Sequence, residues 1–299
     1  MKGVVGNMYF GGIEAGGTKF VCAIGDENGN LIKRIKIPTT TPEETINQVY
    51  DFFKEFKINA MGLGSFGPID VNPDSPTYGY ITSTPKQSWR NYPIVKTLKE
   101  TFQVPVGFTT DVNAAALGES VFGAAKGLDS CLYMTVGTGI GVGAIVHGNI
   151  LEGSSHPEMG HILVRRHPDD HYKGHCIYHS DCFEGLAAGP AIEGRWGKRG
   201  DLLALKEEVW NLEGYYIAQA LMNYILILAP KKIILGGGVM NQNQVFTAVY
   251  ENLSNLLNDY VVLPDSFENY IVQPGLEDRS GIVGSLILAD KIYEQSLLK

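Results

Sequence analysis

The sequence predicts a duplicated α/β architecture with a cleft between its two halves. Each half opens with two or three strand-like segments joined by short glycine turns, and continues with alternating helix and strand patterns. The chain has 299 residues, the length of about two domains. Its composition, 44% hydrophobic and 19% charged, supplies enough apolar side chains for two cores. We expect one lobe over residues 9–118 and another over 119–299, and the last helix could pack back onto the first lobe.

The first half reads as three strands and a helix, then two more strands and a second helix. An Asn28-Gly29 pair predicts a tight turn between the second and third strands. Thr41 supplies a capping hydroxyl for the first helix, and Pro42 suits its first position. Apolar residues from Ile46 to Phe56 recur on one face of that helix. The expected strands cover 9–15, 19–25, 31–37, 61–66 and 104–109, and the second helix covers 112–122.

The second half repeats this opening and then becomes more helical. The segment 165–181 is dense in His, Asp and Lys, and is expected to form an inserted surface loop. The expected strands cover 131–136, 141–146, 149–151, 232–235 and 270–272, and the expected helices cover 186–196, 202–228, 241–257 and 282–295.

The overall charge and the apolar runs exclude several classes of protein. A net charge of −8 argues against binding to nucleic acid, because phosphate backbones require a basic surface. A small phosphorylated ligand needs only a local site. No apolar run approaches the roughly 20 residues of a membrane-spanning helix, and the first ten residues lack the apolar region of a signal peptide. These features predict a cytoplasmic protein with no membrane partner.

Two glycine-rich turns occupy equivalent places in the two halves. Gly16, Gly17 and Thr18 follow the first strand, and their backbone N–H groups could approach an anion without a Cβ in the way. Lys19 could add positive charge, and Glu14 could hold water around Mg²⁺. The second turn contains Gly137, Thr138 and Gly139. Each turn alone could be an ordinary hairpin, but the pair predicts a symmetric phosphate clamp.

Two further motifs fit nucleotide-dependent phosphoryl transfer. Asp111 stands where a strand ends and a helix begins, so it could be the helix N-cap or a general base for a substrate hydroxyl. Asn113 could hold a neighbouring hydroxyl. The second motif follows strand 232–235, where three consecutive glycines favour close approach of a flat base and ribose over a simple strand-to-helix turn. It includes Gly237, Gly238, Val239, Met240, Asn241 and Gln242.

The four cysteines divide into two pairs. Cys22 and Cys131 lie in apolar strand-like runs and are expected to be small buried core residues. Cys176 and Cys182 flank His179 at three-residue spacing, which favours a metal site over a disulfide in a cytosolic chain. Zn²⁺ usually takes four ligands in a closed structural site.

His161 is our choice for the fourth zinc ligand. The other histidines considered for that place are His156, His167, His171 and His175, and a coincidental surface cluster is the alternative to a metal site.

These motifs, in this order, closely resemble the ROK family of sugar kinases, in particular its bacterial fructokinase branch, over about residues 9–290. The resemblance implies two actin-like, ribonuclease H-like lobes, with ATP, Mg²⁺ and Zn²⁺ as cofactors and a small-molecule sugar as substrate. It places Asp111 on the catalytic aspartate and Asn113 on a sugar-binding asparagine. Glu158, His161 and Glu184 would touch the sugar, and Thr138 and Pro190 would line the nucleotide site. Members of the family are often homodimers.

Three departures from the common ROK pattern resemble the fructokinase branch. Glu14 replaces an Asp, Thr110 replaces an Asn, and His179 replaces a Cys of the metal knuckle. The resemblance therefore favours phosphorylation of fructose to fructose 6-phosphate. The alternatives are a kinase of the same type acting on mannose, glucose or an amino sugar, a zinc hydrolase using Glu158 as its base, and a non-catalytic sugar sensor. A hydrolase needs an open metal position, which four protein ligands do not leave.

Overall fold

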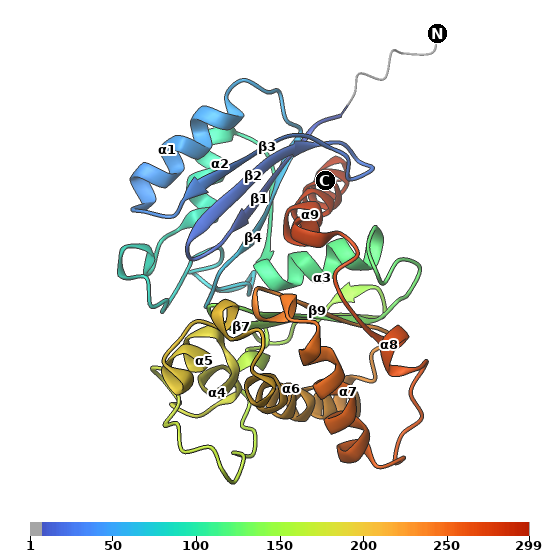
Figure 1. The fold of residues 1–299 in the computed structure, drawn as a ribbon. Helices are drawn as coiled ribbons and strands as arrows, with labels where there is room; N and C mark the ends of the chain where they lie inside the picture. The colour runs from blue at the N-terminus through green and yellow to red at the C-terminus, as the bar shows by residue number, and fades with distance from the viewer. Residues whose placement is uncertain (1–7, 299) are drawn as a thin grey trace. The chain divides into compact units, whose positions relative to one another are not determined.

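A computed structural model of the chain describes residues 8–298, which divide into two compact α/β units (Figure 1). Unit 1 comprises residues 8–126, 150–156 and 275–298, and unit 2 comprises 127–149 and 157–274. Each unit is built around a five-stranded mixed sheet. Among the described residues, no helix combines the length and apolar character that crossing a bilayer requires.

The sheet of unit 1 has the order β3-β2-β1-β4-β5. Its strands are β1 (Phe10–Ala15), β2 (Lys19–Gly25), β3 (Leu31–Pro38), β4 (Ala60–Ser65) and β5 (Val106–Thr110). β1, β2 and β3 pair antiparallel, whereas β4 lies parallel to both β1 and β5. Because β1, β4 and β5 run in the same direction, their carboxyl ends meet at one edge of the sheet.

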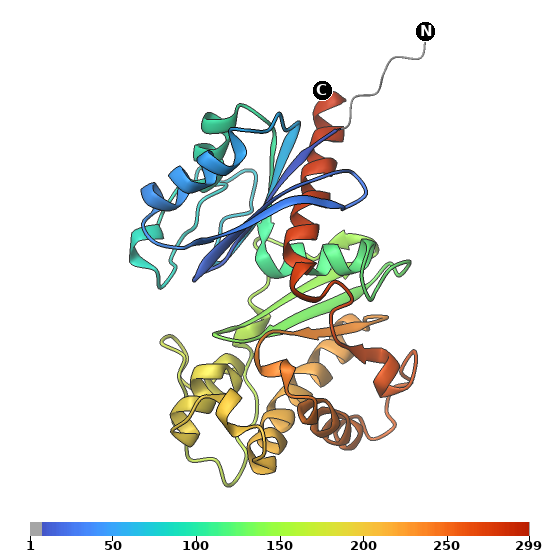
Figure 2. The same ribbon diagram turned by 45° about the horizontal axis from the view of Figure 1, so that its top comes forward.

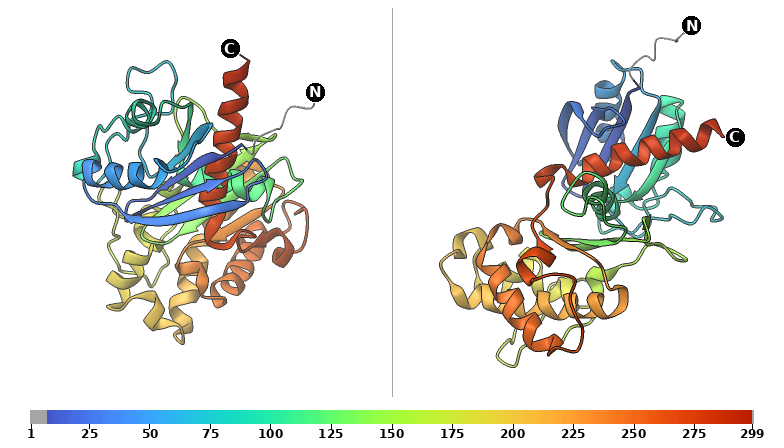
Figure 3. Two further views of the ribbon diagram at one scale, coloured as in Figure 1. Left: turned by 90° about the horizontal axis from the view of Figure 1, so that it is seen from above. Right: turned by 90° about the vertical axis from the view of Figure 1, so that its right-hand side faces the viewer.

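Helices cover both faces of this sheet (Figures 1 and 2). On one face, α1 (Pro42–Phe53) and α2 (Ile94–Phe102) bury their apolar sides against alternate residues of β1, β2 and β4. On the other face lie α3 (Asp111–Val121) and α9 (Ser280–Leu297), and α9 crosses the sheet and contacts β1, β2, β4 and β5 (Figure 3). A 3₁₀ turn, η1 (Gln87–Trp89), lies in the connection before α2.

The crossing of α3 and α9 is unusually close. A Cβ added at Gly284 of α9 would lie 1.6 Å from the carbonyl oxygen of Ala114 on α3, so glycine is required there. This contact fixes the helix whose first residue is Asp111 against the helix that covers β1 and β4.

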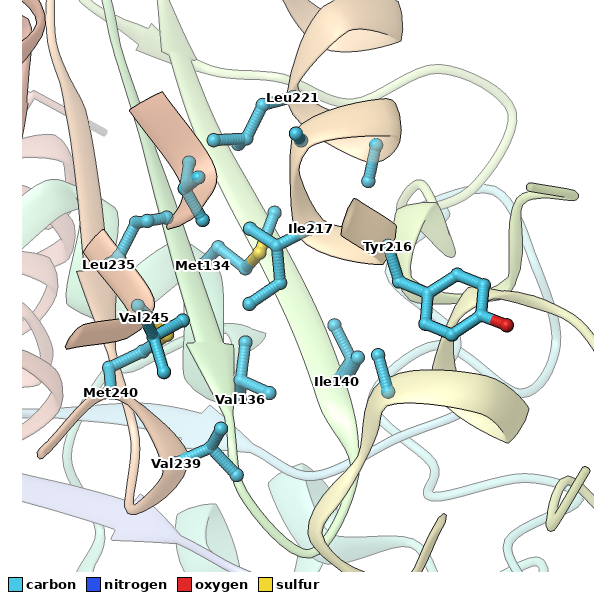
Figure 4. Close-up of a cluster of buried hydrophobic side chains, with 14 of the residues drawn as sticks. Met134, Val136, Ile140, Tyr216, Ile217, Leu221, Leu235, Val239, Met240 and Val245 are labelled. Carbon is cyan, nitrogen blue, oxygen red and sulfur yellow. The ribbon is translucent and has the colours of Figure 1, made fainter. Parts of the chain in front are cut away.

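Unit 2 has a sheet of order β10-β9-β6-β7-β8. The main strands β6 (Cys131–Val136) and β7 (Ile140–Val146) pair antiparallel, and β9 (Ile233–Gly236) lies parallel to β6. Figure 4 shows the core, where Met134 and Val136 of the sheet meet Ile217 and Leu221 of α6. The edge strands are β8 (Asn149–Ile150) and β10 (Ile271–Val272), and the helices are α4 (Phe183–Ala187), α5 (Gly189–Trp196), α6 (Glu207–Leu228), α7 (Gln244–Leu257) and α8 (Phe267–Tyr270). Four further 3₁₀ turns are η2 (Met159–His161), η3 (Gly200–Leu203), η4 (Val239–Asn241) and η5 (Glu277–Arg279), of which η5 belongs to unit 1.

Several sequence expectations about helices were wrong. Helix α2 was not predicted, although Ile94, Val95 and Leu98 give it a buried face. The helix expected over 186–196 is two helices that break at Ala188, because Pro190 lies in the first turn of α5, where proline suits a helix start. The helices expected from 202 and 241 each begin with a 3₁₀ turn before the α-helix proper.

Candidate active site and metal centre

The first glycine turn joins β1 to β2 and is supported from β3. Gly16 N–H donates to the carbonyl of Lys19 at 2.9 Å, which closes the turn. Thr39, just after β3, donates its hydroxyl to Gly16 O at 2.7 Å and its N–H to Thr18 O at 3.0 Å. The N–H groups of Gly17 and Thr18 make no hydrogen bond to another residue between 8 and 298. Thr39 therefore fixes the carbonyl groups of the turn, whereas the N–H groups of Gly17 and Thr18 can donate to a ligand.

Glu14 lies one residue before the end of β1, with its carboxyl group packed near the start of α9 at Gly281. Burial raises the pKa of Glu14, and the positive charges of Arg34 and Lys19 oppose that rise. A cation near this carboxyl would favour its ionised form further.

Asp111 is the first residue of α3, directly after β5, but it is not the N-cap. Thr110 is the cap, because its hydroxyl accepts the N–H of Asn113 at 3.1 Å. Of the two roles considered for Asp111, the helix N-cap is therefore wrong. The Asp111 carboxylate accepts the N–H of Val112 at 2.9 Å and sits where the helix dipole favours negative charge. This position, at the carboxyl end of a parallel strand, is where open α/β sheets bind ligands.

Asn113 is buried and oriented by its own helix and strand. Its amide Nδ2 donates to the hydroxyl of Thr109 at 3.2 Å, so the amide oxygen is left to face another group. Thr109 also hydrogen-bonds Glu152, whose pKa is raised by burial despite that bond and the charge of His156. The sequence motifs did not single out Glu152, because it lies 39 residues beyond Asn113 and in no recognised spacing.

The second glycine turn meets two other segments of unit 2. Gly137 N–H donates to Gly139 O at 2.9 Å, and the N–H of Gly189 donates to Gly137 O at 2.7 Å. A Cβ added at Gly137 would lie 3.9 Å from the backbone nitrogen of Gly238. Three segments therefore lie together: the second glycine turn, which contains the exposed Thr138; the start of α5, which contains Pro190; and the triple-glycine turn after β9.

Where these three segments meet, the triple-glycine turn contributes backbone atoms rather than side chains. Gly237 has φ +92° and lies against Val136, where a Cβ would come within 2.4 Å of the Val136 carbonyl. The side chains of Val239 and Met240 point into the hydrophobic core, as Figure 4 shows. Any contact of these two residues with a nucleotide must therefore come from their backbone. Asn241 is exposed and Gln242 half-buried, so their side chains can reach solvent.

The metal-ligating residues expected from the sequence lie together. The potential ligand atoms of His161, Cys176, His179 and Cys182 all lie within 4.8 Å of one another. His161 Nδ1 is 3.4 Å from Cys182 Sγ and 3.7 Å from Cys176 Sγ, and His179 Nδ1 is 3.8 Å from Cys176 Sγ. Tetrahedral zinc bonds of about 2.0 to 2.3 Å place neighbouring ligands about 3.3 to 3.8 Å apart, so the donor set fits zinc.

The histidines considered as rivals of His161 make other contacts or lie outside this cluster. His156 accepts the N–H of Ile69 at 3.1 Å, and His167 accepts the N–H of Asp169 at 3.2 Å. Burial raises the pKa of the Cys182 thiol to about 11. A metal ion that binds this sulfur as a thiolate must therefore displace a proton.

Glu184 links the second glycine turn to the metal cluster. Its Oε2 accepts the N–H of Ile140 at 3.0 Å, next to Gly139, and its Oε1 is 4.0 Å from Nε2 of His161. One ring nitrogen of His161 thus faces the sulfur atoms while the other faces a carboxylate. Glu158 lies in the same segment, where its carbonyl accepts the His161 N–H. These residues form one connected set in unit 2.

The loop that carries the candidate metal ligands is anchored by a buried ion pair that the sequence did not reveal. Arg195 of α5 contacts Asp170 with an N···O distance of 2.9 Å, and both side chains are almost fully buried. Tyr216 also donates to Asp170, at 2.5 Å. Burial acts to raise the pKa of Asp170, but the hydrogen bonds from Arg195 and Tyr216 lower it on balance. Asp170, Arg195 and Tyr216 are far apart in sequence and carry no local signature.

Two α/β units with mixed five-stranded sheets, each with a glycine turn between its first antiparallel strands, define an actin-like fold of the type found in sugar kinases. The family model of the ROK family matches residues 10–292. A putative fructokinase of Bacillus subtilis (strain 168) is 62% identical over 95% of this chain and 96% of its own length. A fructokinase of Lactococcus lactis subsp. cremoris is 48% identical over 96% and 99%. The chain belongs to the ROK family.

The solved structures agree with this assignment. A ROK hexokinase from Thermus thermophilus is 26% identical and superimposes with a TM-score of 0.79, covering 96% of this chain and 100% of its own. A ROK glucokinase from Streptomyces griseus, solved with glucose and AMPPNP, is 24% identical with a TM-score of 0.74 over 96% and 100% of the two chains, and this likeness concerns the fold alone. The predicted fold class and family resemblance are confirmed.

Proposed function

We propose that this protein is an ATP-dependent hexose kinase that converts fructose to fructose 6-phosphate. The observation that carries the proposal is full-length similarity, at 41% to 62% identity, to five bacterial relatives whose names include fructokinase. A glucokinase of Thermotoga maritima is only 27% identical. Because the similarity is much greater on the fructokinase side, fructose is a better candidate than glucose.

In this proposal Asp111 orients the attacking sugar hydroxyl and accepts its proton. Its place at the start of α3 favours the ionised form that a base requires. Asn113, Glu158, His161 and Glu184 would hold the other sugar hydroxyls. Two observations support these roles. The hydrogen bond from Asn113 Nδ2 to Thr109 leaves the Asn113 amide oxygen available, and Nε2 of His161 faces Glu184.

The two glycine turns would bind the phosphates of ATP. Gly16, Gly17, Thr18 and Lys19 form the first, and Gly137, Thr138 and Gly139 form the second. Mg²⁺ would neutralise phosphate charge when bound with the nucleotide, and Glu14 is the residue suited to hold water around it. The adenosine would lie along the meeting place of Pro190 with Gly237, Gly238, Val239, Met240, Asn241 and Gln242.

The direct test is release of ADP coupled to a panel of hexoses, with and without Mg²⁺. We expect activity with fructose that depends on Mg²⁺. Preference for mannose, glucose or an amino sugar would replace fructose as the substrate within the same reaction. Sugar binding without consumption of ATP would instead favour a sensor and would remove the kinase proposal.

We further propose that His161, Cys176, His179 and Cys182 bind one structural Zn²⁺ per chain. Four protein ligands leave no open position, so the metal would stabilise the loop rather than take part in the chemistry. Elemental analysis of purified protein should find about one zinc per chain. His179→Gln should lose the metal, whereas the matched control His171→Gln, an exposed histidine of the same loop outside the cluster, should keep it. Equal zinc content in both variants would contradict the assignment.

The homodimer implied by the family resemblance remains a prediction. Sedimentation equilibrium would test it, with a mass twice that of one chain as the expected result and a monomer at all concentrations as the contradicting one.

A further inference from the structure

A lysine without any motif of its own contacts the segment that supports the first glycine turn. Nζ of Lys86 donates to the carbonyl oxygen of Thr39 at 3.0 Å. Thr39 is the residue that bonds both Gly16 and Thr18 through its hydroxyl and its N–H. The Lys86 ammonium is therefore two hydrogen bonds from the backbone of the turn.

The backbone that carries Lys86 is fixed by a buried tryptophan. Trp89 is fully buried, and its N–H donates to Lys86 O at 2.9 Å. Its indole Nε1 donates to Thr40 O at 2.8 Å, one residue beyond the carbonyl that Lys86 contacts. The Trp89 ring also packs against Phe20, the second residue of β2. The segment around η1 is thus fastened to the same part of the chain that supports the glycine turn.

The charge of Lys86 has no counter-charge among residues 8–298. Lys86 is half-buried and forms no ion pair with any residue in the described range 8–298. By contrast, Lys36 and Arg34 of β3 both pair with Asp278. An ammonium has three N–H donors, and Lys86 uses one on Thr39. The two remaining N–H donors and the unpaired charge are suited to an anion at the turn.

We propose that Lys86 binds the transferred phosphoryl group of ATP in the kinase reaction. This inference rests on the proposed function. During transfer the bond from the γ-phosphorus to the β,γ-bridging oxygen breaks, a bond to the sugar oxygen forms, and the hydroxyl proton passes to Asp111. Negative charge spreads over the oxygens of the transferred group, where a fixed cation stabilises it more than it stabilises bound ADP.

The test compares Lys86→Met, which keeps the length but removes the charge, with Lys86→Arg. Lys99→Met is the matched control, because Lys99 is an exposed lysine of α2. We expect Lys86→Met to lower kcat about 10²- to 10³-fold, while the KM for fructose and the calorimetric Kd for ADP change less than about threefold. Arginine should restore at least about a tenth of the activity, since it keeps the charge. Lys99→Met should match wild type.

Two further outcomes separate the possible errors. A Lys86→Met enzyme with wild-type kcat would overturn this inference and leave the proposed kinase function intact. A variant that loses ADP affinity as much as it loses kcat would also overturn it, because that pattern indicates that Lys86 only supports the structure of the turn. Calorimetry with ADP, fructose and fluoroaluminate, a mimic of the transferred phosphoryl group, should show weakened binding only for Lys86→Met. A wild-type protein that is inactive with every hexose would remove the proposed function, and this inference with it.

Discussion

Glu119, near the end of α3, is the buried carboxylate whose replacement should be most informative about the support of Asp111. Its side chain is fully buried. Oε1 accepts the N–H of Leu276 at 3.0 Å and the hydroxyl of Ser280 at 2.6 Å. Oε2 accepts the N–H groups of Ala124 at 2.7 Å and of Gly275 at 3.0 Å. One carboxylate thus joins α3 to the segment that begins α9.

Glu119→Gln keeps the shape but turns one acceptor into a donor. The less costly orientation places the NH2 group of the new glutamine at the Oε1 position. There the Ser280 hydroxyl can rotate to accept a hydrogen bond, and only the Leu276 N–H loses its acceptor. At the Oε2 position two backbone N–H groups would lose theirs. An unsatisfied buried N–H costs about 1–3 kcal/mol. The two bonds that remain on the oxygen become neutral instead of charge-assisted, each weaker by about 1 kcal/mol. We therefore expect the free energy of unfolding to fall by about 3–5 kcal/mol.

Urea unfolding at pH 7, followed by tryptophan fluorescence and circular dichroism, measures this loss. The matched control is Glu100→Gln on the surface of α2, where the carboxylate pairs with Lys96 at 3.8 Å and such an exposed pair contributes about 0–1 kcal/mol. A Glu119→Gln protein that unfolds within about 0.5 kcal/mol of the control would refute the argument that this carboxylate holds α3 in place.

Three other substitutions test separate parts of the structure. Gly284→Ala should lower Tm, because its Cβ would lie 1.6 Å from Ala114 O and overpacking costs about 1–3 kcal/mol; an unchanged Tm would contradict the close crossing. Arg195→Met should cost about 3–5 kcal/mol in urea unfolding, since it leaves Asp170 buried without its partner. Burial raises the pKa of Glu213 well above 4.5, so wild type should lose stability as pH rises from there, and Glu213→Gln should abolish that slope in Tm.

Local signals in the sequence were sufficient for most strands and for the start of α1. Thr41 caps α1 as expected, with its hydroxyl accepting the Glu44 N–H at 3.3 Å, because a capping side chain acts on residues beside it in the chain. The order β3-β2-β1-β4-β5 and the return of residues 275–298 to unit 1 depend on pairing between distant segments. No local pattern determines such pairing. Helix α2 was missed for a different reason, since no side-chain cap marks its start at Pro93.

The residues of the candidate site also divide into those that local sequence patterns identify and those that only the fold reveals. Three-residue spacing identified Cys176, His179 and Cys182, and His161 was chosen from five histidines at the sequence level; the fold places its ring in the same cluster. Supporting residues such as Lys86 and Asp170 act through tertiary contacts, so they carry no motif. Val239 and Met240 were selected from a motif in the sequence, but their side chains pack into the core, so only their backbone is available to the nucleotide proposed above.

The central claim is that Asp111 acts as the base for phosphoryl transfer to a bound sugar. The most direct measurement is kcat for fructose phosphorylation by Asp111→Asn, alongside calorimetric binding of fructose to the same protein. We expect kcat to fall by about 10²- to 10⁴-fold while fructose binds with an affinity close to that of wild type. A variant that keeps wild-type turnover would show that Asp111 is not the base.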